Sequence, residues 1–284
     1  SLSGLTKKTF ARRLHKLGLT KYMNAKITTW VEFKQRWDGV RNFLMGGECI
    51  PFEFRIPPLD RVVDLVRRDE MAEIGPGISA DRLLLEDASK AFRAKSIDQA
   101  LASPFSLAHY RLSCFDTPGK CLHGFGERVL ERWHQALTAQ GFTWTRCYPI
   151  IFISGIRCAT NYHMDFSHVL AWQIYGTKRF CGLRDPQRWA PLEVRLRYKA
   201  GELRKPAELS SDDALCYDMD PGDALWNALL TPHWVEASDA VALSINISHG
   251  GLRLDGKLCP HERELEDYRR EHPAEAPRAV SGTY

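Results

Sequence analysis

The segment 160–166 places a histidine and a carboxylate two residues apart, in His163 and Asp165. Residues i and i+2 of a β-strand point to the same face, so we expect this imidazole and this carboxylate to lie side by side. A third ligand is predicted at His233, which follows an apolar strand that begins after a Pro-Gly-Asp turn and ends at Pro232. Two histidines and one carboxylate leave three positions of an octahedral metal open, which suits Fe(II) better than structural zinc.

A lysine in an apolar strand accompanies these three residues. Lys178 lies 15 residues after His163, beyond a Tyr-Gly-Thr turn, and Thr160 lies three residues before His163. Lysine is rarely tolerated inside a protein without an anionic partner. We therefore expect Lys178 and Thr160 to bind a carboxylate.

The elements that must position these residues follow from the hydrophobic spacing, which changes near residue 143. Upstream, helical spacing predicts helices at 6–19, 29–44, 79–102 and 127–139. Downstream, runs rich in aromatic and β-branched residues predict strands at 148–154, 162–166, 169–174, 178–183, 224–230, 234–237 and 241–248. A polar stretch at 184–215 is interpreted as inserted loop and helix, and 261–271 as a short helix.

The predicted fold is mainly β with added helices (α+β). We expect an antiparallel jelly-roll or cupin-like barrel at 106–256. A helix-rich N-terminal region at 1–105 should pack on it, and a C-terminal helix and tail should occupy 257–284.

Composition excludes several classes of protein. Of the 284 residues, 44% are hydrophobic and 26% charged, which argues against disorder, collagen and coiled coil. No apolar run approaches the ~18 residues of a membrane span, so we expect a soluble, cytoplasmic protein with no membrane partner. The eight cysteines are irregularly spaced without a C-x-x-C pair. They are expected to be reduced thiols rather than a disulfide scaffold or a zinc site.

The net charge of +4 is distributed unevenly, because residues 1–26 contain seven basic residues and no acidic one. We interpret this stretch as the solvated face of a helix, with contact to a phosphate backbone or an acidic partner as the alternative. Without a recognisable nucleic-acid-binding module, nucleic acid is not expected as a partner.

Two blocks of the sequence resemble a known family. The stretch from Tyr148 to Asp185, with T-x-x-H-x-D and then Q-I-Y-G-T-K-R-F, resembles the Jumonji C (JmjC), cupin-like 2-oxoglutarate oxygenases. The block from Pro221 through His233, with the later Ser-Ile-Asn ending at Asn246, resembles the second half of the same family. The matching part spans about a third of the chain. The helical and zinc modules of histone demethylases are not recognised, so the closest group is the small hydroxylase-like members.

The resemblance implies a double-stranded β-helix that holds Fe(II) through His163, Asp165 and His233. It also implies 2-oxoglutarate as cosubstrate, with its distal carboxylate paired to Lys178 and Thr160. The expected enzyme is a 2-oxoglutarate-dependent dioxygenase that hydroxylates a C–H bond and releases succinate and CO2. The substrate is expected to be a peptide, an amino-acid-like compound or another small molecule, and a homodimer is left open.

One position departs from the family pattern. Several members carry an asparagine that holds the near carboxylate of the cosubstrate where this chain has Val169. Alternation along 241–248 puts small polar residues on one face, so Asn246 is the first replacement and Tyr148 the next. Val169 also favours the alternative function, a cupin-type metal-binding module or sensor without 2-oxoglutarate turnover.

The remaining conspicuous residues have two interpretations each. Trp226 is a candidate wall of the substrate pocket or a core residue, and Arg157 is a candidate substrate contact or a solvated arginine. His168 is expected not to bind metal. His249 is expected at the surface, with the mouth of the site as the alternative.

Overall fold

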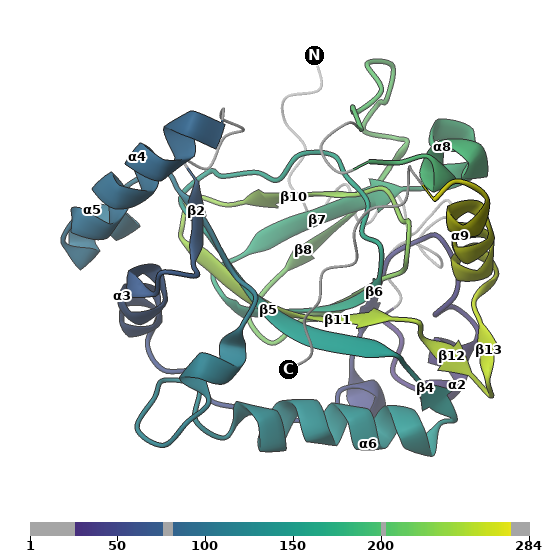
Figure 1. Ribbon diagram of the computed structural model, residues 1–284, viewed down its shortest axis with the longest axis horizontal. Helices are drawn as coiled ribbons and strands as arrows, with labels where there is room; N and C mark the ends of the chain where they lie inside the picture. Colours follow the sequence, from purple (N-terminus) through teal and green to yellow (C-terminus); the bar gives the residue numbers. More distant parts are fainter. Residues whose placement is uncertain (1–25, 76–81, 200–202, 274–284) are drawn as a thin grey trace, which may run out of the picture.

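The computed structural model describes residues 26–75, 82–199 and 203–273. In these ranges the chain folds into antiparallel sheets with helices around them, so the α+β class is confirmed (Figure 1). The major sheet has seven strands in the order β1-β9-β6-β11-β5-β3-β2. Their bounds are Phe43–Met45, Ala224–Asn227, His168–Tyr175, Ala242–Gly250, Arg146–Ser154, Ser106–His109 and Glu73–Gly75.

Two smaller sheets complete the β-structure. One has the order β10-β7-β8 and forms the other wall of the main cavity. Its strands span Trp234–Ala237, Lys178–Leu183 and Ala214–Met219. The other has the order β13-β12-β4, with strands at Lys257–Leu258, Arg253–Leu254 and Phe142–Thr143.

Alternation along the central strands separates two environments. On β11, Ser244 and Asn246 line the cavity, whereas Leu243, Ile245 and Ile247 are fully buried on the opposite face. This is the alternation expected from the sequence. The opposite face packs in a core that also contains Trp133 of α6 and Phe33 of α2.

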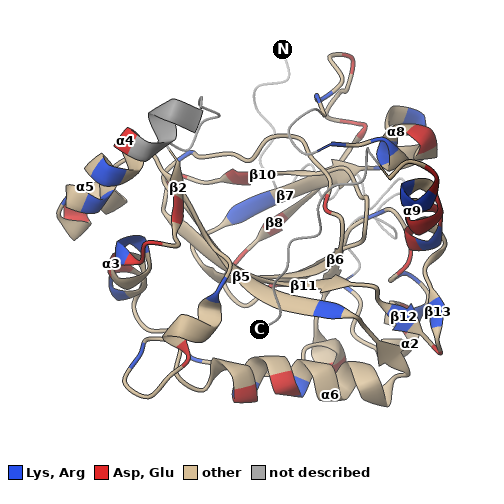
Figure 2. Ribbon diagram, viewed as in Figure 1, with Lys and Arg blue, Asp and Glu red and all other residues tan. Residues whose placement is uncertain are grey.

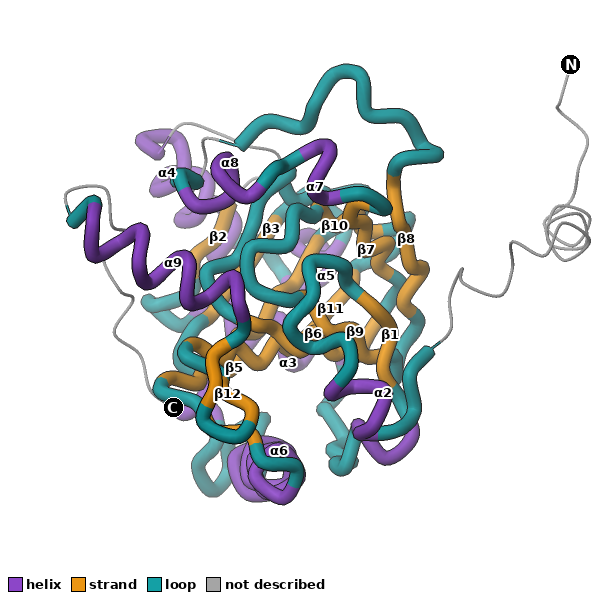
Figure 3. The backbone as a smooth tube through the Cα atoms, turned by 90° about the vertical axis from the view of Figure 1, so that its right-hand side faces the viewer, coloured by secondary structure: helices purple, strands orange, loops and turns teal. Residues whose placement is uncertain are grey.

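The helices lie around this framework. Figures 1 and 3 show α6 along the core side of the major sheet and α9 near β12. The α-helices are α2 Trp30–Lys34, α3 Leu59–Arg68, α4 Arg82–Ala94, α5 Ile97–Leu101, α6 Arg132–Ala139, α7 Pro186–Trp189, α8 Leu192–Leu196 and α9 Pro260–Glu271. The other helical turns are η2 Gly47–Cys49, η3 Leu112–Phe115 and η4 Gly126–Glu131, the last of these π-helical.

Several expected helices differ from those observed. The helix expected at 29–44 is only the five-residue α2, and its last residues instead form edge strand β1, paired with β9. The helix expected at 79–102 is divided into α4 and α5, because Ser96 caps a new helix by accepting a hydrogen bond from the Gln99 N–H. The helix expected at 6–19 and the first three residues of the helix expected at 79–102 lie outside the described residues.

The strand expected at 162–166 is not a strand. This stretch is irregular and contributes one isolated bridge, between His163 and His233. β8 begins at the end of the stretch expected to be loop and helix, and β1 and β2 come from the region expected to be helix-rich. Three-residue strands carry too little alternation to be recognised in a sequence.

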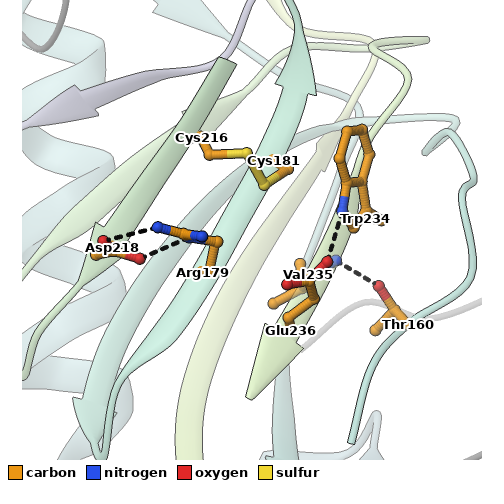
Figure 4. Close-up of a disulfide and its surroundings, with 8 residues drawn as sticks. All are labelled: Thr160, Arg179, Cys181, Cys216, Asp218, Trp234, Val235 and Glu236. Carbon is orange, nitrogen blue, oxygen red and sulfur yellow. Dashed lines mark hydrogen bonds and ion pairs between the residues drawn. A yellow bond between two sulfur atoms is a disulfide. The ribbon is translucent and has the colours of Figure 1, made fainter. Parts of the chain in front are cut away.

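A disulfide corrects the expectation that all cysteines are reduced. Cys181 of β7 and Cys216 of β8 are direct partners in the register and are joined by an S–S bond (Figure 4). Directly opposite residues of an antiparallel pair share a face. Because the two cysteines are separated by 35 positions in the sequence, no local motif indicates that they are neighbours. The other six cysteines are free. Within the described ranges, no helix has the length and apolar character needed to cross a membrane.

Candidate metal centre and adjoining cavity

The three residues predicted as metal ligands lie together. Nε2 of His163 is 3.9 Å from one carboxylate oxygen of Asp165, and Nε2 of His233 is 3.7 Å from the other. The centroids of the two imidazole rings are 4.2 Å apart. One ligand atom from each residue can be chosen so that all three lie within 4.8 Å of one another, as a single metal ion requires.

Hydrogen bonds fix which nitrogen of each histidine faces the carboxylate. Nδ1 of His163 is 2.6 Å from the Asn161 carbonyl oxygen, and Nδ1 of His233 is 2.9 Å from that of Thr231. A carbonyl oxygen only accepts, so both Nδ1 atoms carry the proton and both Nε2 atoms present a lone pair. Burial lowers the pKa of His233 to about 4, which keeps this ring neutral. The donors are therefore in the state that metal binding needs.

Backbone pairing brings the two ligand segments together. The His163 N–H donates to the His233 carbonyl and the His233 N–H donates to the His163 carbonyl, both at 2.9 Å. The Leu230 N–H donates to the Asp165 carbonyl, also at 2.9 Å, and Leu230 itself has a positive φ of 56°. The three ligands are thus held between two irregular segments that are tied by main-chain hydrogen bonds.

Two further residues orient the ligands and were not found by sequence reasoning. The Asn227 side-chain amide at the end of β9 donates to Asp165 Oδ2 at 3.1 Å. The Phe180 ring stacks on His233 at a centroid distance of 4.9 Å and an interplanar angle of 9°. Both contacts depend on strands that are distant in sequence from the ligand they support. The only signal for Asn227 was a polar residue inside an apolar run.

The ligands open into a cavity of about 480 Å³ between the major sheet and the β10-β7-β8 sheet. Its wall includes Phe152 and Ser154 of β5, Val169 and Gln173 of β6, and Asn246 of β11. Lys178 and Phe180 of β7 complete it from the other sheet. Most of this lining is apolar or uncharged, and Lys178 is the one lysine or arginine among the described lining residues.

Lys178 is the most unusual group in the cavity. Its side chain is 5% exposed, and its ammonium donates to the Ser244 hydroxyl at 3.0 Å and to the Phe152 carbonyl at 3.3 Å. Burial lowers the pKa of Lys178 to about 7. The ion pairs formed by the described residues include none to Lys178. Figure 2 shows basic residues at the start of β7, where exposed Arg179 pairs instead with Asp218.

A tight turn between β6 and β7 places Lys178 at this position. Gly176, between β6 and β7, has a φ of 63°, and a Cβ there would overlap the Val241 carbonyl oxygen. The buried Gln173 amide donates to the carbonyls of Tyr175 and Gly176 at 2.8 and 3.0 Å, which holds the turn from inside.

The other predicted cosubstrate residues lie at different places. Asn246 lines the cavity, and its side-chain oxygen is buried without a hydrogen-bond partner. Thr160 also lines the cavity, but its hydroxyl accepts a hydrogen bond from the Val235 N–H at 2.8 Å (Figure 4). Tyr148, opposite Ser248 in the register, is not among the lining residues.

Both tentative substrate-pocket residues lie away from the cavity. Trp226 is fully buried on the core face of β9, where its indole donates to the Trp37 carbonyl at 3.0 Å. Arg157 has 79% of its side chain exposed and pairs with Asp239. Alternation along β9 directs Trp226 away from the face that Asn227 occupies, which corrects its expected role as a pocket wall.

Two other histidines are in the core. His168 lies apart from the triad, where Nδ1 accepts the Leu229 N–H and the ring stacks on Trp226. His249 is fully buried, which corrects the expected surface position, and burial lowers its pKa to about 3. β11 extends to Gly250, so His249 lies within a central strand rather than beyond its end.

The comparisons with known proteins return only solved structures. No protein-family model and no curated protein matches the chain. The crystal structure of Escherichia coli ribosomal oxygenase YcfD is similar, with a TM-score of 0.47 and 17% identity, over 92% of this chain and 64% of that one. YcfD in complex with cobalt and 2-oxoglutarate gives a TM-score of 0.45 and 14% identity, over 91% and 63%. The chain spans less than two thirds of the length of these relatives.

Proposed function

We propose that this chain is an Fe(II)- and 2-oxoglutarate-dependent oxygenase that hydroxylates a C–H bond of a peptide, amino-acid-like or small-molecule substrate. The observation that carries the proposal is the presence of both binding groups in one cavity. Two imidazoles and a carboxylate lie together at its wall, and the same cavity contains a buried lysine that forms no ion pair with any described residue. The two sheets around this site support our interpretation of the fold as a double-stranded β-helix.

The donor set fits Fe(II). Two neutral imidazole nitrogens and one carboxylate form a facial triad with open positions, and the cavity gives a cosubstrate access to them. Bound Fe(II) would supply the redox chemistry that couples decarboxylation of 2-oxoglutarate, with release of succinate and CO2, to oxidation of the substrate. Asn227 would hold the Asp165 carboxylate in place, and Phe180 would hold the His233 ring.

The protein's own contribution to cosubstrate binding is a buried cation with a hydroxyl beside it. Lys178 and Ser244 would bind the distal carboxylate of 2-oxoglutarate, since an ammonium at 5% exposure gains most from an anionic partner. Asn246 is the group we assign to the near carboxylate, because it lines the cavity and its side-chain NH2 group can donate to a carboxylate. Thr160 is assigned a place in the wall, since its hydroxyl is engaged by β10.

Anaerobic addition of Fe(II) and then 2-oxoglutarate to the full chain tests this function. Chelation of the iron by the cosubstrate should produce a visible charge-transfer band, and admission of oxygen should convert 2-oxoglutarate to succinate. If iron binds but neither the band nor succinate appears, the proposal is wrong. A screen of peptide pools and metabolites by product mass then identifies the substrate class.

The second candidate is a cupin-type metal-binding module without 2-oxoglutarate turnover. Val169 favours it, because this aliphatic side chain lines the cavity where family members use an asparagine. Such a module needs no buried cation in the cavity. Tight iron binding with no effect of 2-oxoglutarate on the spectrum would select it.

A further inference from the structure

A second group of metal-ligand side chains lies on the core face of the major sheet. Cys147 of β5 and His249 of β11 are direct partners in the register, and His134 of α6 packs against them. The Cys147 sulfur is 3.2 Å from Nε2 of His134 and 3.6 Å from Nε2 of His249. The three residues lie on three different elements, and their spacing in the sequence matches no metal-binding motif.

These separations suit a tetrahedral metal. Thiolate and imidazole ligands at the usual Zn–S and Zn–N distances and tetrahedral angles stand about 3.5 Å from each other. One ligand atom from each of the three side chains can lie within 4.8 Å of the others. One thiolate and two imidazoles form a borderline-soft donor set, which Zn²⁺ prefers to the oxygen-rich sets used for Mg²⁺ or Ca²⁺.

The surroundings leave one coordination position accessible. His134 and Cys147 line a surface groove of about 880 Å³, while His249 lies fully buried behind them. The groove also contains Glu131, whose carboxylate accepts a hydrogen bond from Gln135 and adds negative charge at the entrance. A cation can therefore enter from the groove, and its fourth ligand would be water.

The site is held together without metal by two hydrogen bonds. The Trp133 indole donates to Nε2 of His249 at 3.2 Å, and the Cys147 thiol can donate to Nε2 of His134. The Trp144 ring packs on His134 with centroids 4.3 Å apart. Nδ1 of His249 is buried and forms no hydrogen bond within the described ranges, so the described residues do not fully satisfy this polar cluster.

We propose that His134, Cys147 and His249 form a second metal site, separate from the triad and specific for Zn²⁺ or a similarly thiophilic divalent ion. Binding replaces the thiol proton by the metal, so the Cys147 S–H bond breaks, a sulfur–metal bond forms and one proton passes to solvent. The Nε2 lone pair of His249 turns from the Trp133 N–H to the metal. The site is independent of 2-oxoglutarate chemistry.

Cobalt titration of the metal-free full chain tests the site. Co²⁺ bound to a thiolate gives an intense near-ultraviolet charge-transfer band, whereas Co²⁺ bound at the triad has no sulfur ligand and gives none. One equivalent of this band should appear, and Zn²⁺ should displace it. Asp165→Ala should keep the band, which makes the result independent of the proposed iron site.

Variants assign the band to particular residues. Cys147→Ser should remove the band completely. His134→Gln should weaken the affinity for Co²⁺ about tenfold or more, since losing a residue that only hydrogen-bonds to a metal ligand already lowers metal affinity 10–100-fold. Cys49→Ser and Cys259→Ser are matched controls at buried thiols and should leave the band unchanged. Cys259 is the sharper control because it also lies beside a histidine, His168.

Three results would overturn the proposal. They are absence of the band at Co²⁺ concentrations that fill the triad, survival of the band in Cys147→Ser, and its loss in Cys259→Ser. If circular dichroism shows Cys147→Ser unfolded, His134→Gln decides, because His134 is only half-buried beside the groove. An unchanged affinity in that folded variant contradicts the site.

Discussion

The two faces of the major sheet hold the same kinds of side chain in different states. On the cavity side, both histidines of the triad have Nδ1 bound to a carbonyl and Nε2 turned toward Asp165. On the core side, Nε2 of His249 accepts a hydrogen bond from Trp133, and the Cys147 thiol is protonated because burial raises its pKa to about 12. The first group is ready for a metal, whereas the second must exchange a proton and a hydrogen bond for it.

The two groups differ in how far the protein orients the ligands before a metal binds. At the triad, carbonyl oxygens outside the ligand set bind Nδ1 of both histidines and so leave both Nε2 atoms for a metal, and a cavity adjoins the site. At the second group, the ligands partly satisfy each other. We therefore expect substitutions at the triad to change chemistry with little change in folding.

The largest expected effect is that of Asp165→Ala. Loss of the charged ligand should reduce iron-dependent 2-oxoglutarate turnover by more than about 100-fold, because losing a residue that only hydrogen-bonds to a metal ligand already lowers metal affinity or activity 10–100-fold. The fold should persist, since Asp165 is outside the hydrophobic core. Turnover and circular dichroism measure this, with Asp218→Ala as the control at an exposed carboxylate. An unaffected turnover would remove Asp165 from the metal site.

Lys178→Met should have the second-largest effect on turnover of 2-oxoglutarate. The variant keeps the length of the stem but loses the charge, and a hydrogen bond to a charged group contributes about 1.5–3 kcal/mol. The KM for 2-oxoglutarate should therefore rise by about 10- to 100-fold, measured by succinate formation. Lys257→Met is the control at an exposed lysine. A KM equal to that of the unmodified chain would show that the cosubstrate does not contact Lys178.

Asn227→Ala should weaken iron binding about tenfold, because the amide orients the Asp165 carboxylate. Iron titration followed by the anaerobic charge-transfer band gives the affinity. The KM for 2-oxoglutarate at saturating iron should change much less. His168→Ala, in the core on the other side of the sheet, should retain iron with unchanged affinity. If instead His168→Ala lost iron and His163→Ala kept it, the assigned triad would be incorrect.

Lys178 should also make stability depend on pH in the absence of ligand. Its pKa is lowered to about 7 in the folded chain from 10.5, so between these values the unfolded chain binds more protons and stability rises with pH. The penalty for the buried charge is complete below about pH 7. Lys178→Met should therefore gain stability relative to the unmodified chain as the pH falls from 10.5 toward 7, by several kcal/mol in all, since one pKa unit corresponds to about 1.4 kcal/mol. Urea unfolding at several pH values measures it. A difference that stays constant with pH would contradict the lowered pKa.

The smallest effect separates the two candidates for the near carboxylate. Asn246→Ala should raise the KM for 2-oxoglutarate a few-fold, as expected for one neutral hydrogen bond. Tyr148→Phe should leave it unchanged, because Tyr148 does not line the cavity. If Tyr148→Phe raised the KM and Asn246→Ala did not, Tyr148 would bind the near carboxylate instead.

Local patterns in the sequence predicted some of these features well. His163 and Asp165 are two residues apart, and β5, β6, β7, β10 and β11 contain enough alternating or β-branched residues to be recognised. The polar face of β11, with Ser244 and Asn246, follows from alternation alone. Although 162–166 is not a strand, the triad forms, because main-chain pairing between His163 and His233 replaces the expected strand geometry.

Features that depend on distant pairing could not be predicted. The register of β5 and β11 brings Cys147 beside His249, and that of β7 and β8 joins Cys181 to Cys216, over sequence separations that no motif records. Asn227 and Phe180 support ligands from other strands. The burial of His249 depends on α6 covering the sheet, which periodicity along β11 does not encode.

The depth of the side chains in the cavity has a kinetic consequence. His163 and Asp165 are 31% and 32% exposed, whereas Lys178 is 5% exposed. A dicarboxylate that reaches Lys178 must therefore pass the more open end first, and any larger molecule bound at that end would cover it. Addition should follow a compulsory order, with the dicarboxylate first, and the two products should leave in the reverse order. Initial-rate patterns with varied concentrations of both reactants would then show substrate inhibition when the larger molecule is in excess.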